Sequence, residues 1–349
     1  MLEAVAAVEA MEGYSAPLEG RRGLLRLDFN ENTLGPSPKV VEAIRAIPAE
    51  HYAIYPEYAG LAECYAASAG CRAEQVGLFN GVDAAILAVF LAFGGAGDVL
   101  LTTTPTFGYY GPCAQQRGMT VQAIPYEGEQ FAFPLAAIGD ALGQEPSVLM
   151  VCNPNNPTGT RLSPGQLLAL ARRAPRTLVV VDELYEAFSG DSVLPGSLAL
   201  PNVLVLRSLS KTAGIAGLRV GFGIGDPGLI ERLRRVTGPY DINAFGVAAA
   251  FAALADQAYV DAYVREVLAA KAWLATRLAR AGIRHHSSAG NFLLIWPEGD
   301  AEAVVQNLRE AGILVRSMAG KPLIDGSFRV SIGTRPQMER FWQALVSCG

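Results

Sequence analysis

A lysine shortly after an apolar run has the position that most clearly suggests chemistry. Lys211 closes the segment RSLSK (207–211), which follows the run Val203–Leu206, and Arg219 lies eight residues further along. An amine that leaves a buried strand among hydroxyl groups, with an arginine nearby, suits imine formation beside a phosphate group. A lysine after a strand is usually a solvated surface residue, so this segment alone leaves both interpretations open.

An aspartate ends a second strongly apolar run. Asp182 follows Val179–Val181 and precedes Tyr185 by three residues. A buried carboxylate needs a cationic partner, because an isolated one is costly to desolvate. A protonated pyridine nitrogen would be such a partner and would make the ring an electron sink, with Tyr185 close enough to reach the phenolic oxygen of the ring. The alternative is that Asp182 is a helix N-cap.

Polar loops follow three further apolar runs. The loop NPNNPTG (153–159) contains Asn156, and its prolines fix the backbone so that asparagine side chains are free to donate hydrogen bonds. An ordinary turn uses the same residue types, although two Asn-Pro units exceed what a turn needs. The turn at Gly81 to Asp83 begins a predicted helix, whose N-terminal amides would bind phosphate. Tyr110 can stack on a flat ring, with core packing as the alternative.

The elements that must position these residues follow a βαβ pattern. Apolar runs alternate with helix-favouring stretches, which predicts an α/β fold with a mostly parallel sheet. Ligands in such sheets bind at the carboxyl ends of the strands, where the polar residues above lie. The predicted strands are Val76–Phe79, Val99–Thr102, Thr120–Ile124, Ser147–Cys152, Leu178–Val181, Val203–Leu206 and Val220–Ile224.

The pattern changes towards the C-terminus. A helix-favouring stretch extends from Asn243 to about Ala281, and from Arg284 short strands interleave with helices in a smaller α+β domain. The strands predicted there are Phe292–Trp296, Ile313–Arg316 and Phe328–Ile332. The predicted division is an N-terminal arm and part of the small domain in residues 1–44, a large domain in 45–245, and an interdomain helix with the small C-terminal domain in 246–349.

Composition excludes several classes of function. The net charge of -5 over 349 residues gives no general attraction to nucleic acid or to an anionic membrane. The N-terminal residues resemble neither a signal peptide nor a membrane span, which favours a cytoplasmic enzyme. The scattered cysteines have no metal-binding spacing and are expected to be reduced thiols, with no metal site. They are Cys64, Cys71, Cys113, Cys152 and Cys348.

One dinucleotide-type motif is rejected. The segment GIGDPG (223–228) matches GxGxxG after a predicted strand. Pro227 is incompatible with the glycine-rich turn that this spacing forms around a dinucleotide. No acidic residue ends a second strand about 20 residues later, where such a site would need one. We therefore interpret the segment as a turn.

Three motifs in this order resemble the fold-type I pyridoxal-phosphate-dependent aminotransferases, and most closely their histidinol-phosphate aminotransferase branch. They are PNNPTG (154–159), VVVDELY (179–185), and SLSK followed by AGLRVGF (208–222), within a resemblance from about Leu27 to Phe341. The resemblance implies a large domain with a seven-stranded, mostly parallel sheet and a smaller α+β domain. A regulatory domain fused to a DNA-binding module is disfavoured, because no long basic N-terminal segment is present.

The implied reaction moves an amino group between an amino acid or a histidinol-phosphate-like amino-alcohol phosphate and a 2-oxo acid such as 2-oxoglutarate. Threonine-phosphate decarboxylases and some enzymes of specialised metabolism share the architecture, so a pyridoxal-phosphate-dependent decarboxylase is the alternative. The bond broken at the α-carbon depends on its alignment with the ring, and the sequence leaves that alignment open.

The resemblance also assigns roles to individual residues around pyridoxal 5'-phosphate. Lys211 holds the cofactor as a Schiff base and moves the proton between the substrate α-carbon and C4′. Asp182 pairs with the pyridine nitrogen, Asn156 and Tyr185 hydrogen-bond the phenolic oxygen, and Tyr110 stacks on the ring. The phosphate is assigned to Gly81, Val82, Asp83, Ser208, Ser210 and Arg219.

Substrate and partner residues follow from the same resemblance. Arg329 and Arg316 bind the acidic group of the substrate, which a planar guanidinium can hold through two hydrogen bonds. Asn32 of the NEN segment is a further substrate residue, and Tyr55 reaches the cofactor phosphate of the neighbouring subunit in a homodimer. The chain departs from the common family pattern at three points, where it has GVDA at 81–84, Ile54 and Thr33.

Overall fold

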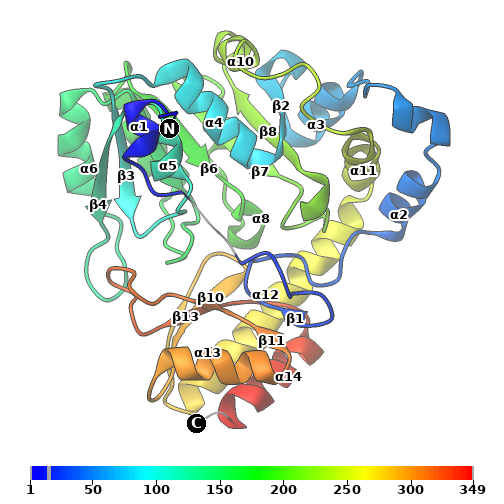
Figure 1. Cartoon of the computed structure of the whole chain (residues 1–349), viewed down its shortest axis with the longest axis vertical. Coiled ribbons are helices and arrows are strands. Elements are labelled where there is room, and N and C mark those ends of the chain that lie inside the picture. Colours follow the sequence, from blue (N-terminus) through cyan, green and yellow to red (C-terminus); the bar gives the residue numbers. More distant parts are fainter. Residues whose placement is uncertain (1, 14–16, 348–349) are drawn as a thin grey trace.

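The larger lobe is built on a seven-stranded sheet (Figure 1). The computed structural model describes residues 2–13 and 17–347. The strand order is β2-β8-β7-β6-β5-β3-β4, in which only β8 runs antiparallel to its neighbours. The strands are β2 (Val76–Asn80), β3 (Val99–Thr104), β4 (Thr120–Pro125), β5 (Val148–Cys152), β6 (Leu178–Asp182), β7 (Val203–Ser208) and β8 (Val220–Gly225). All the strands predicted for this sheet are confirmed.

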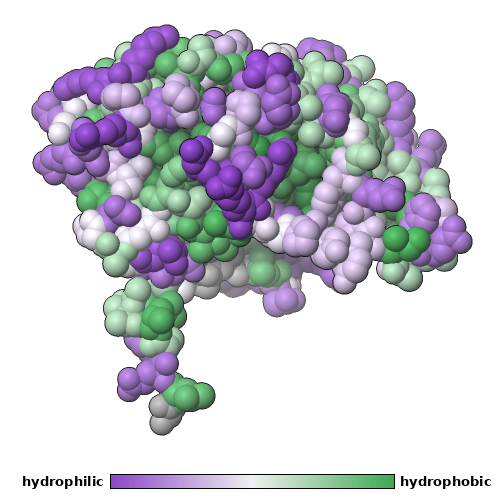
Figure 2. Space-filling model, turned by 90° about the horizontal axis from the view of Figure 1, so that it is seen from above, coloured by the Kyte–Doolittle hydropathy of each residue, from purple (hydrophilic) through white to green (hydrophobic). Residues whose placement is uncertain are grey.

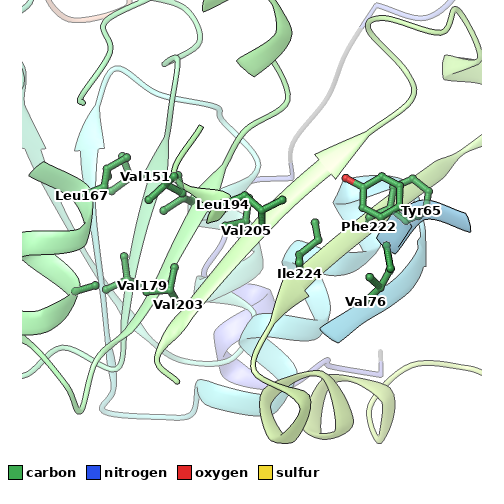
Figure 3. Packing of buried hydrophobic residues seen from close by; sticks show 14 of the residues in the cluster. Tyr65, Val76, Val151, Leu167, Val179, Leu194, Val203, Val205, Phe222 and Ile224 are labelled. Carbon is green, nitrogen blue, oxygen red and sulfur yellow. The ribbon is translucent and has the colours of Figure 1, made fainter. Parts of the chain in front are cut away.

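Helices cover both faces of this sheet because its strands are apolar on both faces. Val179 and Val181 of β6 point into one core, whereas Val180 between them points into the other. Figure 3 shows the first core, where Tyr65 stacks on Phe222 with ring centroids 3.7 Å apart. The helices of this lobe are α3 (Leu61–Ala69), α4 (Gly81–Phe93), α5 (Tyr110–Gln115), α6 (Leu135–Ala141), α7 (Pro164–Arg173), α8 (Glu186–Ser189), α9 (Leu194–Ser197), α10 (Pro227–Arg234) and α11 (Ala244–Leu254).

The antiparallel β8 places the rejected GxGxxG segment far from the carboxyl edge. Residues 223–225 belong to β8, and Asp226 caps α10 through a 2.8 Å hydrogen bond from the amide of Gly228. The interpretation as a turn is confirmed at the step from β8 to α10. Figure 2 looks onto this end of the molecule, where hydrophilic side chains gather near the middle of the face.

The smaller lobe has a four-stranded antiparallel sheet in the order β12-β13-β10-β9. It comprises β9 (Arg284–Ser287), β10 (Phe292–Trp296), β12 (Arg316–Ser317) and β13 (Phe328–Ser331), with α12 (Gln257–Arg280), α13 (Ala301–Glu310) and α14 (Arg335–Ser347). Two predictions here were wrong. The strand Ile313–Arg316 is two strands, since β11 (Ile313–Leu314) pairs with β1 (Leu25–Arg26) and β12 pairs with β13. The long helix is interrupted at Ala255 and Asp256, between α11 and α12.

The N-terminal part of the chain passes from the small lobe to the large one. After β1, the segment 27–36 leads to α2 (Pro38–Arg45), which Ser37 caps by accepting a hydrogen bond from the amide of Val40. The short α1 (Ala6–Glu9) buries none of its side chains. The 3-10 turns are η1 (Ala49–Ala53), η2 (Ala73–Gln75), η3 (Leu142–Gln144) and η4 (Ala216–Leu218). The domain limits given above stay predictions.

Two expectations from composition concern the whole chain. No helix in the described part is long and apolar enough to span a membrane. Four cysteines are free thiols, namely Cys64, Cys71, Cys113 and Cys152, while Cys348 lies outside the described residues.

Candidate active site

The carboxyl ends of β6 and β7 bring the predicted aspartate and lysine to one site. Asp182 ends β6 with 2% of its surface exposed, and burial raises the pKa of its carboxyl to about 6. The positive charge of Lys211 acts in the opposite direction on that pKa, so the amine is near enough to act on the carboxylate. Asp182 is not a helix N-cap, because Tyr185 occupies that position before α8.

Tyr110 orients the carboxylate of Asp182. Its ring is fully buried, and its hydroxyl donates a 2.5 Å hydrogen bond to Oδ2 of Asp182. The amide of Leu184 donates to Oδ1 at 3.2 Å. Both oxygens of the carboxylate are therefore held by the protein, an interaction of Tyr110 that the sequence did not indicate.

The amine of Lys211 is buried and points to the N-terminal arm. Its Nζ donates a 2.9 Å hydrogen bond to the backbone carbonyl of Phe29. Burial, and then the charge of Arg329, lower the pKa of this amine to about 8. A substantial fraction of the amine is consequently neutral near physiological pH, the form that attacks a carbonyl carbon.

The start of α4 forms a cradle that only bare backbone permits. Gly81 has φ +74°, and a Cβ built there would lie 2.4 Å from Nη2 of Arg219. A Cβ on Gly221 would lie 2.5 Å from the carbonyl carbon of Gly81. The Arg219 guanidinium pairs with Asp83 at 2.7 Å, at the helix N-terminus. The cation, the helix dipole and the backbone amides at the start of α4 together suit a phosphate group.

Two serines complete the cradle. The hydroxyl of Ser208 donates to the carbonyl of Val220 at 3.0 Å and accepts a 2.8 Å hydrogen bond from the hydroxyl of Ser210. The structure thus brings together the residues predicted to bind phosphate, on the end of β7, the start of β8 and the start of α4.

Asn156, Tyr185 and Arg329 meet on the opposite side of the site. The Asn156 amide donates to the Tyr185 hydroxyl at 3.3 Å and accepts a hydrogen bond from Arg329. Asn155, by contrast, is fully buried and bonds to the carbonyl of Pro105 and the hydroxyl of Thr158. Asn156 bonds to two residues of the site, whereas Asn155 bonds to the loop and to Pro105, so, contrary to the expectation, neither asparagine is left without a partner.

Three cationic side chains, those of Arg329, Arg316 and Lys321, lie near one another. Arg316 lies directly opposite Arg329 in the register of β12 and β13, so both project from the same face of the sheet. Burial and then the charges of these two arginines lower the pKa of Lys321. Lys321 was not predicted, because it lies in a polar loop without a motif.

The N-terminal arm supplies contacts that the sequence analysis missed. Asn30 is almost fully buried, has φ +54°, and donates a 3.0 Å hydrogen bond to the hydroxyl of Tyr185. The backbone carbonyl of Asp28 accepts a hydrogen bond from Arg329. An asparagine tolerates the left-handed region better than most residues, so the NEN segment was the available signal.

Two predicted residues lie differently from expectation. Asn32 donates to the carbonyl of Thr212 at 2.8 Å and accepts from the amides of Leu34 and Gly35, so both polar atoms of its side chain already bond to backbone. This geometry positions the arm, and the substrate role of Asn32 stays a prediction. Tyr55 is 68% exposed and stacks on Tyr240 with ring centroids 3.9 Å apart, on the outside of its own chain.

Comparison with known proteins agrees with this geometry. Residues 22–345 match the family model Aminotransferase class I and II. The chain belongs to this family. This aminotransferase is 34% identical over 338 residues to histidinol-phosphate aminotransferase of Moorella thermoacetica, covering 93% of this chain and 86% of that one. The crystal structure of histidinol-phosphate aminotransferase from Sinorhizobium meliloti in complex with pyridoxal-5'-phosphate superposes with a TM-score of 0.91 at 25% identity, covering 100% and 98% of the two chains.

The aminotransferase is therefore a fold-type I enzyme of the histidinol-phosphate aminotransferase branch, and its cofactor is pyridoxal 5'-phosphate. The decarboxylase alternative is not favoured. L-threonine-O-3-phosphate decarboxylase from Porphyromonas gingivalis shares the fold with a TM-score of 0.82, but at 24% identity over 93% of this chain and 98% of that one. The predicted recognition, fold and cofactor are confirmed.

Proposed function

We propose that this aminotransferase exchanges an amino group between an amino compound with a terminal acidic group, resembling histidinol phosphate, and a 2-oxo acid such as 2-oxoglutarate. The single observation that carries the proposal is the position of Arg329, which lies beside Asn156 and opposite Arg316 while its charge acts on Lys211. A substrate whose acidic group binds these arginines has its other end directed towards the lysine.

In this proposal, different residues of the chain bind different groups of the cofactor. The turn at Gly81 to Asp83, with Ser208, Ser210 and Arg219, binds the phosphate group. Asp182 holds a proton on the pyridine nitrogen, and Asn156 and Tyr185 donate to the phenolic oxygen. Tyr110 stacks on the ring while its hydroxyl orients Asp182. When bound, pyridoxal phosphate withdraws electrons from the α-carbon of an amino substrate, so that its hydrogen becomes acidic.

Lys211 then acts as the base in this scheme. Burial lowers the pKa of this amine to about 8, closer to neutral pH than that of a free lysine. In this scheme the amine removes the proton from the substrate α-carbon and returns a proton at C4′. The arm segment 28–32 covers the lysine from one side and excludes water from the proton being moved.

A homodimer belongs to the same proposal. Tyr55 contacts the cofactor phosphate of the partner in this arrangement, and its 68% exposure within one chain supports a surface that a second subunit covers. Two neighbours of Tyr55 in sequence, Tyr52 and Ile54, are also exposed hydrophobic residues, and so is Tyr240, on which Tyr55 stacks. A cytoplasmic location and the three-part domain division remain proposals alongside it.

A panel of amino donors tests the proposed reaction. The holoenzyme is incubated with histidinol phosphate, phosphothreonine, glutamate and other amino acids, and 2-oxo acid and carbon dioxide are both measured. We expect amino transfer to 2-oxoglutarate, best with a phosphorylated or acidic donor, and no carbon dioxide. Release of carbon dioxide without a new amino acid would contradict the proposal.

The lysine assignment has its own control. Borohydride reduction of the holoenzyme, followed by peptide mass spectrometry, is expected to place the cofactor on Lys211. Lys211→Ala is expected to trap no cofactor and to lose about a thousandfold or more in kcat. Lys39→Ala, which removes an exposed lysine, serves as the matched control and is expected to behave as the parent enzyme. Trapping on any other lysine would overturn the assignment.

A further inference from the structure

A polar cavity of about 780 Å³ lies outside the active site, at the junction of the two lobes. The larger lobe contributes the segments 130–133 and 159–162 and the end of α8, and the smaller lobe contributes Lys271 of α12 and the segment 286–289. Figure 1 shows α8 beside α12 at this junction. Its volume is in the range of cavities that bind small organic molecules.

The charges of this junction cavity are of one sign. The positive charges are those of Arg161 and Lys271, because burial lowers the pKa of the third basic residue, His286, and leaves its imidazole neutral near pH 7. None of the described lining residues is acidic. A second cavity of about 760 Å³, at the amino ends of the strands, differs in this respect. Its lining contains Asp98, Glu145 and Asp226 as well as arginines, so its charges balance internally. The junction cavity therefore has the electrostatic character of an anion site, and the second cavity does not.

Lys271 is the residue that most needs an anionic partner. Its Nζ donates to the carbonyls of Ser288 at 2.9 Å and Gly290 at 2.7 Å, and an ammonium group has a third hydrogen to donate. Burial alone lowers the pKa of this amine to about 8, with no carboxylate acting against it. Among the described residues, Lys271 forms no ion pair. A bound anion would supply the countercharge that the chain does not provide.

The remaining walls suit an organic anion rather than a bare ion. Arg161 pairs with Asp191 at 2.7 Å and donates to the carbonyl of Ser189, which leaves further guanidinium hydrogens available. The imidazole of His286 packs edge-on against Phe131 with ring centroids 4.9 Å apart, and both rings line the same cavity as the two cations. We propose that the junction cavity binds a small organic anion, with its phosphate or carboxylate groups between Lys271 and Arg161 and its apolar part against Phe131.

The cavity is also connected to the active site through the backbone. Gly159, three residues after Asn156, accepts a 3.0 Å hydrogen bond from the amide of Ala289. A Cβ on Gly159 would lie 1.9 Å from Cβ of Ser288, so the two segments are in direct contact. An anion that draws Lys271 towards it also acts on the carbonyls of Ser288 and Gly290.

Calorimetric titration of the holoenzyme with pyrophosphate and with citrate tests the proposal. Saturating pyridoxal phosphate keeps the phosphate cradle filled, and the two probes separate a phosphate preference from a carboxylate one. We expect one probe to bind, and Lys271→Met and Arg161→Gln each to weaken it about tenfold or more, as loss of a charge-assisted hydrogen bond predicts. Arg161 is partly exposed, so its variant keeps the test valid if Lys271→Met fails to fold.

Two control variants show where the probe binds. Arg232→Gln removes a cation from the second cavity, and Arg329→Ala removes one from the active site. Both are expected to retain the parent affinity for the probe. Binding that is lost in Arg329→Ala but kept in Arg161→Gln would place the anion in the active site and overturn the proposal. Absence of binding for both probes would overturn it as well.

Discussion

The two sides of the active site are built in different ways. On the sheet side, Asp182, Ser208 and Lys211 stand at or just after the ends of neighbouring parallel strands, and Tyr110 orients the carboxylate. On the arm side, the segment 28–32 is held by hydrogen bonds to residues more than 150 positions away, many of them through its backbone. The sheet side is fixed by the main core of the enzyme, and the arm side depends on a small number of polar contacts.

This difference predicts different consequences of substitution. A change on the sheet side should remove chemistry and leave the fold, because the strands are stabilised by their apolar cores. A change on the arm side should alter substrate binding or local stability, because each contact there holds backbone in place.

The largest effect is expected for Asp182→Asn. The variant should lose about a hundredfold or more in kcat, since a neutral amide cannot hold a proton on the pyridine nitrogen. The folded-state pKa of Asp182 is raised to about 6, so ionising this carboxyl costs the cofactor-free protein stability as pH rises from about 4 to 6. Thermal unfolding of the cofactor-free variant at pH 7 should therefore show no loss of stability. A marked drop in its melting temperature would contradict the separation of chemistry from fold.

Arg329→Lys probes the arm side of the site. The lysine cannot reproduce the contacts to both Asn156 and the carbonyl of Asp28. Its ammonium group also cannot form the two parallel hydrogen bonds that a guanidinium forms with an acidic group. We expect kcat/KM for an acidic donor to fall about thirtyfold or more, corresponding to roughly 2 kcal/mol or above. Steady-state kinetics should show most of the change in KM. The matched Arg316→Lys variant should lose less, and a pure kcat effect would argue against substrate binding.

Gly214→Ala tests how the arm is seated. Gly214 has φ +74°, and a Cβ there would lie 2.4 Å from the carbonyl carbon of Gly35. The substitution should cost about 1–3 kcal/mol of unfolding free energy and increase cleavage of the arm by added protease. Gly217→Ala is the control, because a Cβ at that position meets nothing within 4 Å. Equal stability of the two variants would remove the argument for close seating.

The smallest effect concerns pH. The pKa of Lys211 is lowered to about 8, so capture of pyridoxal phosphate by the cofactor-free enzyme should quicken about fivefold from pH 7 to pH 8, about twofold more by pH 9, and then level off. The same lowered pKa makes the contribution of Lys211 to stability rise with pH between about 8 and its unfolded value near 10.4. Stopped-flow absorbance measures the capture rate. A rate that keeps rising towards pH 10 would show that burial does not act on this amine.

The sequence revealed the sheet side almost completely and the arm side poorly. Asp182 and Lys211 stand out because a charged residue at or shortly after the end of an apolar run is costly to bury without a partner. Asn30 and Phe29 act partly through carbonyl and amide groups, which every residue has, so no residue type marks them. The bond between Tyr110 and Asp182 joins two distant segments through folding alone. The split of 313–316 between two sheets likewise depends on partners distant in sequence.

The hydrogen bond from Lys211 to Phe29 has a consequence for the whole arm. An amine that becomes engaged by the cofactor has fewer hydrogens left to offer, so the carbonyl of Phe29 must then find another donor or turn to solvent. The arm would lose this hydrogen bond at Phe29 when Lys211 binds the cofactor, and would form it again when the cofactor leaves. Amide hydrogen exchange at residues 29–32 would thus report the fraction of enzyme that has cofactor bound, without any measurement of turnover.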